Sequence, residues 1–183
     1  MKYWSKSVLS VYKYLQTMTN TIDKIVLNIG KTSNNVSVIS YTSTFHQANK
    51  ILELVDRKRK MINLKVATEE VLSKMDSSEK RILTLCYFDG VTSEMIAQLL
   101  GVSLRTFFRK KEYALKIFSG IMQELGYDEE FFQSEYSTEK WFTAIYDDCI
   151  SKVVETSDSL DKFLVKRVFN EVSKIDIRCN SYV

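Results

Sequence analysis

The segment TSEMIAQLLGVSLRTFFRKKEYALKIF, residues Thr92–Phe118, predicts two short helices joined by a tight turn. Thr92 or Ser93 can cap the first helix, because a hydroxyl oxygen at that position accepts an otherwise unpaired backbone N–H. Gly101 stands where this helix must end, and glycine takes the left-handed conformation of a helix end without strain. Ser103 is a suitable cap for the second helix. The segment therefore predicts a helix-turn-helix.

The two faces of the second helix differ in chemistry. Apolar residues recur at helical spacing on its inner face, namely Phe107, Ala114, Leu115 and Phe118. The outer face and its flanks are mainly basic. This combination is typical of a helix-turn-helix whose second helix enters the major groove of double-stranded DNA. The candidate DNA-contacting residues are Ser103, Leu104, Arg105, Thr106, Phe108, Arg109, Lys110, Lys111, Glu112 and Lys116.

These candidates divide by the contact that each side chain can make. Arg105 and Arg109 lie one turn apart on the same side of the helix, and an arginine pairs bidentately with guanine. Leu104 and Phe108 are suited to contact a thymine methyl group. The lysines are expected to hold phosphates, and they are Lys110, Lys111 and Lys116.

A longer pattern surrounds this segment. The residues of this pattern are Ile96-Ala97 in the first helix, Leu100-Gly101-Val102-Ser103 at the turn, Arg105-Thr106-Phe107 at the start of the second helix and Ala114-Leu115 near its end. The preceding stretch Leu72–Gly90 contributes Met75, Glu79, Ile82, Leu83, Tyr87 and Phe88. Together, over Val66–Leu125, they resemble region 4 of bacterial sigma factors and of the phage-type regulators that share it.

The resemblance implies a fold, a function and partners. It implies a DNA-binding helix-turn-helix, and it makes RNA polymerase a further candidate partner. Leu104 and Phe108 depart from the pattern, since housekeeping sigma factors usually have polar DNA contacts there. This departure argues against recognition of the ordinary −35 promoter element. Two alternatives stay open: a protein-interaction module that docks on RNA polymerase or another regulator, and an RNA-binding relative.

Composition predicts an all-α protein, because proline is absent and only five glycines interrupt the chain. Three parts are expected: an N-terminal helical hairpin or coiled-coil arm over 1–65, the DNA-binding domain over 66–125, and a small acidic and aromatic helical region over 126–183. The chain has neither a long apolar run nor a secretory signal pattern, so a cytoplasmic protein without membrane contact is expected.

Positive charge is concentrated in two segments. Met1–Lys65 carries eleven Lys/Arg against three Asp/Glu, and Ser103–Gly120 carries five against one. Ile121–Asp148 has the opposite balance, with one against eight. Phosphate attraction would be useful in the two basic segments. The densest basic run, Asp56–Lys60, could touch phosphates, or it could be a solvated helix face.

Two long helices are expected in the arm. The first carries a heptad stripe from Trp4 to Ile29, which can pack within the chain or form a homodimer. The second begins at Ser43 or Thr44. Its expected inward residues are Phe45, Ala48, Leu52, Val55, Ile62, Val66, Val71, Leu72 and Met75.

The remaining features give no evidence of catalysis. Cys86, Cys149 and Cys179 lack metal-binding spacing, and the lone His46 has no recognisable acid–base or nucleophilic partner. We therefore expect no enzyme activity, no metal and no cofactor. In the C-terminal region, one helix is expected from Ser137 or Thr138 and another over Ser157–Lys174. Its acidic and aromatic residues favour packing or protein contact over nucleic-acid contact.

Overall fold

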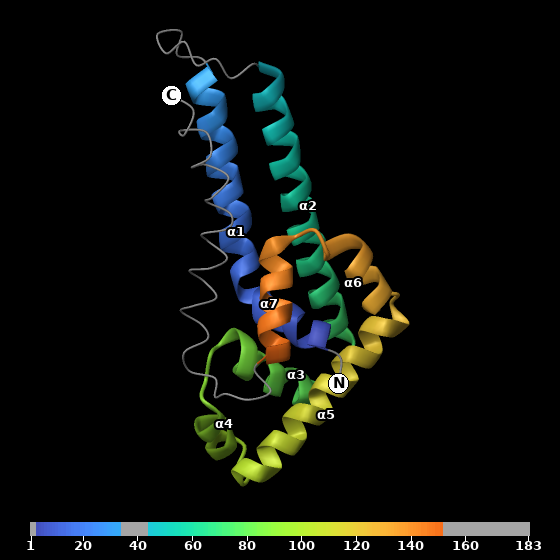
Figure 1. The fold of residues 1–183 in the computed structure, drawn as a ribbon. Helices are drawn as coiled ribbons and strands as arrows, with labels where there is room; N and C mark the ends of the chain where they lie inside the picture. The colour runs from blue at the N-terminus through green and yellow to red at the C-terminus, as the bar shows by residue number, and fades with distance from the viewer. Residues whose placement is uncertain (1–2, 34–43, 152–183) are drawn as a thin grey trace.

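The computed structural model describes residues 3–33 and 44–151, which are helical and contain no strand (Figure 1). The two longest helices are α1 (Tyr3–Ser33) and α2 (Thr44–Lys74). They are antiparallel, because Tyr12 Oη donates to Glu69, Lys65 Nζ to Gln16 and Lys58 Nζ to Asp23. The two helices form an arm that extends beyond the smaller helices (Figure 1).

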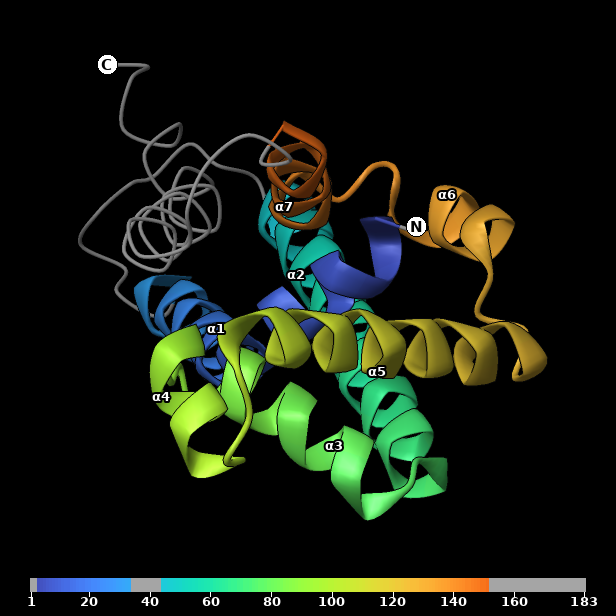
Figure 2. The same cartoon turned by 90° about the horizontal axis from the view of Figure 1, so that it is seen from below.

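The smaller helices pack around one end of the arm. They are α3 (Ser77–Leu83), the π-helix η1 (Thr84–Phe88), α4 (Ser93–Leu99), α5 (Leu104–Glu124), α6 (Glu129–Tyr136) and α7 (Lys140–Ser151). Seen along the arm, α5 crosses the ends of α1 and α2 (Figure 2). The prediction of an all-α fold is confirmed within the described ranges. Within the stretch Leu72–Gly90, α3 starts at Ser77 and passes into the π-helix η1 at Thr84.

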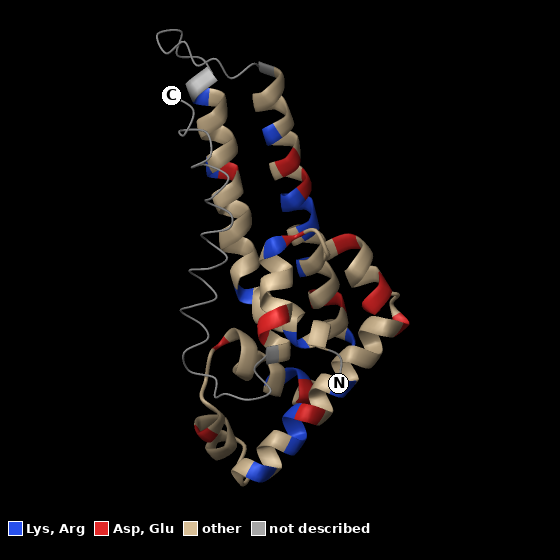
Figure 3. Ribbon diagram, viewed as in Figure 1, with Lys and Arg blue, Asp and Glu red and all other residues tan. Residues whose placement is uncertain are grey.

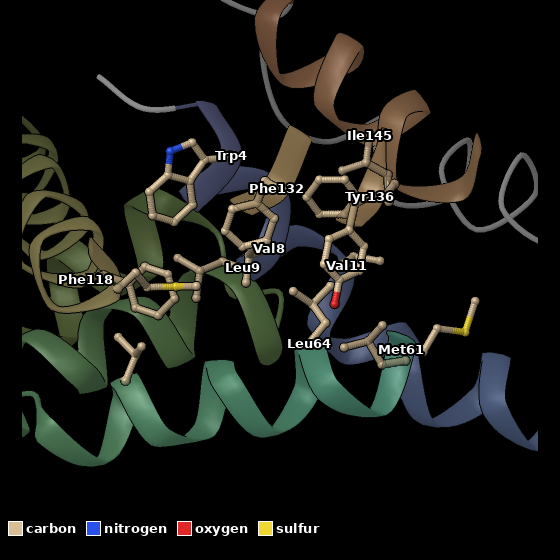
Figure 4. Packing of buried hydrophobic residues seen from close by; sticks show 14 of the residues in the cluster. Trp4, Val8, Leu9, Val11, Met61, Leu64, Phe118, Phe132, Tyr136 and Ile145 are labelled. Atoms are coloured by element: carbon tan, nitrogen blue, oxygen red, sulfur yellow. The ribbon is translucent and has the colours of Figure 1, made fainter. Parts of the chain in front are cut away.

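The heptad stripe of α1 is buried inside the chain. Trp4, Val8, Val11, Leu15, Met18 and Ile22 are each at most 1% exposed. They pack with residues of α2, α5, α6 and α7 in one core (Figure 4). Trp4 stacks on Phe132 with ring centroids 4.9 Å apart. This arrangement supports the intramolecular alternative, and it gives no support to a homodimer through the Trp4–Ile29 stripe.

The predicted inner face of α2 is wrong along most of its length. Phe45, Ala48, Leu52, Val55, Ile62 and Val66 are exposed, whereas Val71, Leu72 and Met75 are buried as expected. The other buried apolar residues are Leu54, Met61, Leu64 and Ala67. The error arises because α2 carries apolar residues on two sides. Spacing alone does not say which side meets α1.

The basic run of α2 binds carboxylates from other parts of the chain, one on α1 and one just before α7. Glu139, only 6% exposed, accepts from Arg57 Nε at 3.1 Å and from Lys60 Nζ at 3.1 Å. The indole N–H of Trp141 donates to the same carboxylate at 2.9 Å. Lys58 pairs with Asp23 of α1 at 2.6 Å. These ion pairs hold α1 and the start of α7 against α2. The prediction of a phosphate contact at this run therefore has no support.

The aromatic residues of the C-terminal region belong to the core. Phe132 and Tyr136 are buried, and the Tyr136 hydroxyl donates to the Lys60 carbonyl at 2.9 Å. Burial is the main cause that raises the pKa of Tyr136. The packing interpretation of this cluster is therefore confirmed. The helix expected over Ser157–Lys174 lies wholly outside the described residues.

Candidate nucleic-acid interface

The helix-turn-helix consists of α4 and α5, and local signals define its boundaries. The Thr92 hydroxyl accepts from the Met95 N–H at 3.4 Å, and the Ser103 hydroxyl accepts from the Thr106 N–H at 3.2 Å. Gly101 ends the first helix with φ of 63°. Both predicted caps and the predicted glycine turn are confirmed.

A small apolar core holds α4 against α5 and α3. Ile82, Ile96, Ala97 and Phe107 are each at most 5% exposed and form one cluster. The far half of α5 enters the main core through Ala114, Leu115, Phe118 and Met122. Because both halves of α5 are anchored, the outer face of this helix has a fixed orientation relative to the body of the protein.

The outer face of α5 presents basic side chains to solvent. Arg105, Arg109, Glu112 and Lys116 are all exposed, and Lys110 is exposed beside them. Figure 3 shows that positive charge recurs along the half of α5 next to α4. Neither arginine is in a salt bridge with another residue of the described ranges. Both guanidinium groups are therefore available to an anionic partner.

Two apolar candidates flank this basic face. Leu104 is 39% exposed and Phe108 is 47% exposed, so both side chains can still be reached by a ligand. The Phe108 ring also lies 5.3 Å from that of the buried Phe107, measured between centroids.

Three more of the predicted site residues have structural contacts. Ser103 caps α5, and its hydroxyl lies 2.9 Å from that of Thr106. Lys111 is half-buried on the inner side of α5, with Nζ 5.3 Å from the centroid of the Tyr87 ring. Lys111 is therefore placed less favourably for a phosphate than Lys110 or Lys116.

Sequence reasoning missed two basic residues beside the site. Lys80 and Arg81 are exposed on α3, which packs directly on α5. Their adjacency in the sequence was visible, but their position next to α5 depends on how α3 folds back. They enlarge the basic surface available around the helix-turn-helix.

The cysteines near this unit show no sign of activation. Burial is the main cause that raises the pKa of the Cys86 thiol, and nearby Lys111 only partly opposes it. Burial likewise raises the pKa of Cys149. A thiol with a raised pKa remains protonated near neutral pH, so neither side chain has the properties of a nucleophile.

Comparison with known proteins gives a match to one family, over the end of α2, the helices α3, η1 and α4, and the first part of α5. Residues 65–116 match the family described as Sigma-70, region 4. No curated protein and no solved structure gives a significant match to the chain. None of the described helices is long and apolar enough to cross a membrane.

Proposed function

We propose that this chain, which carries a sigma-70 region 4 helix-turn-helix, is a sequence-specific DNA-binding transcriptional regulator. The family match supports DNA binding by residues 65–116. The finer claim is that α5 reads a defined base sequence in the major groove.

The observation that carries this proposal is the pair of exposed arginines on a firmly anchored helix. Arg105 and Arg109 lie on the side of α5 opposite the buried Phe107 and Ala114. A guanidinium group can donate two hydrogen bonds to O6 and N7 of guanine. Lys110, beside this face, and Lys116, further along it, are proposed to hold phosphates.

Docking on RNA polymerase or another regulator is the second candidate function, and the structure offers one observation in its favour. Met95 and Leu99 are 55% and 58% exposed on α4. Together with the exposed Leu104 and Phe108, they add apolar surface to a unit that would otherwise be mainly polar outside. Apolar surface of this kind suits a protein partner better than a phosphate backbone.

The test is selection of bound sequences from random duplex DNA with the full chain. The proposal predicts recovery of one motif, and a control selection with Arg105→Ala/Arg109→Ala should recover none. Wild-type protein that enriches no motif would contradict sequence-specific reading. Retention of a structured RNA in preference to duplex DNA would instead favour an RNA-binding role.

A further inference from the structure

Two apolar side chains border the basic outer face of α5. Leu104 is 39% exposed and Phe108 is 47% exposed, and they lie one helical turn apart on the same side of the helix. Phe108 also follows Arg105 by three residues, so these two side chains are neighbours on the helix surface. An apolar pair, Leu104 and Phe108, therefore stands beside the arginine that is proposed to read guanine.

The position of Arg105 in a complex determines what the apolar pair meets. Because Phe108 is a neighbour of Arg105, a duplex that receives the Arg105 guanidinium in its major groove also covers Phe108. The apolar group that the major groove presents is the C5-methyl of thymine. Contact with that methyl group removes apolar surface from water, whereas contact with a polar base edge would leave the donors and acceptors of that edge without partners. Thymine is therefore the base that this surface fits best.

We propose that Leu104 and Phe108 recognise thymine by its C5-methyl group, in a base pair adjacent to the guanine read by Arg105. This inference rests on the proposed function, because it requires α5 to enter the major groove. It adds the chemical class of the target, which is duplex DNA with thymine beside guanine. RNA lacks this feature, since uracil has no C5-methyl group and side chains cannot read the deep, narrow major groove of an A-form helix.

The first test changes the DNA. The probe is the duplex recovered by selection with the full chain, with its thymines replaced one at a time by deoxyuridine. This replacement removes the C5-methyl group and leaves base pairing intact. At a thymine next to the guanine, we expect wild-type affinity to fall about four-fold, which corresponds to one methyl group taken out of apolar contact. Thymines elsewhere in the duplex should tolerate the replacement. Fluorescence anisotropy measures each affinity.

The second test changes the protein. Leu104→Ala/Phe108→Ala should bind the thymine duplex and the deoxyuridine duplex with equal affinity. The matched control is Met95→Ala/Leu99→Ala, which removes two exposed apolar side chains from α4, a helix without lysine or arginine. This control should keep the wild-type preference for thymine. Helix content and binding to random duplex at low salt verify that both variants are folded, and the wild-type comparison in the first test depends on neither of them.

Three results would overturn this inference alone. Wild-type affinity that is unchanged by deoxyuridine at every thymine next to guanine would mean that the apolar pair meets no methyl group. A recovered motif without thymine beside guanine would have the same meaning. A folded Leu104→Ala/Phe108→Ala variant that still prefers thymine would assign the methyl contact to other side chains. In each case a motif is recovered, so the proposed function stands, whereas selection that recovers no motif would overturn both.

Discussion

At the scale of single residues, the basic side chains of α5 lie on different faces of the helix and meet different surroundings. Arg105 and Arg109 project from the exposed face, whereas Lys111 contacts the Tyr87 ring. The sequence placed these side chains at helical spacing, so the two arginines could be predicted. The same spacing puts Lys111 on the inner side, four residues after Phe107, but it could not show that the Lys111 ammonium meets the Tyr87 ring of η1.

Arg105→Ala should reduce affinity for the selected duplex by about 1–3 kcal/mol, with little change on random DNA. Lys116→Ala should instead weaken both duplexes to a similar extent and reduce the salt dependence by about one ion. Both residues are exposed, so neither change removes core volume. Fluorescence anisotropy with the two duplexes checks this. Equal loss on both duplexes with Arg105→Ala would make Arg105 a phosphate contact.

At the scale of elements, boundaries with local chemical signals were predictable, whereas the buried face of α2 was not. Thr92, Gly101 and Ser103 fix the turn by interactions within a few residues. The buried face of α2 depends on contacts from distant parts of the chain. Glu139, which binds Arg57 from 82 positions away, left no local pattern to detect.

Two glycines test the role of backbone conformation in the helix-turn-helix. Gly101 has φ of 63°, so Gly101→Ala should destabilise the protein by about 1–2 kcal/mol, although no atom crowds the added methyl. Gly120 lies within α5 without positive φ, so Gly120→Ala should stabilise by about 0.5–1 kcal/mol. Urea unfolding of both variants measures this. Equal effects of the same sign would contradict the left-handed turn.

At the scale of the whole molecule, one core joins the arm to the helix-turn-helix. Its buried residues include Trp4 of α1, Phe118 of α5 and Phe132 of α6. The heptad stripe of α1 could be predicted because it is regular. Its partners could not, because the same spacing suits a helix of this chain and a helix of another copy.

Leu15 and Leu27 test which side of α1 is buried within the chain. Leu15 is fully buried, so Leu15→Ala should destabilise the protein by about 2–5 kcal/mol. Leu27 is 61% exposed, so Leu27→Ala should change stability by less than about 0.5 kcal/mol. Chemical unfolding measures both free energies. A small effect of Leu15→Ala would contradict burial of the stripe within the chain.

The central claim is that the full chain binds double-stranded DNA and distinguishes one sequence from another. The most direct measurement is the affinity of wild-type protein for the selected duplex and for a scrambled duplex of equal length, across a series of salt concentrations. We predict that affinity for both falls as salt rises, with the selected duplex bound at least about 10³-fold more tightly at physiological salt. Equal affinity for the two duplexes, or binding of neither at low salt, would contradict the account.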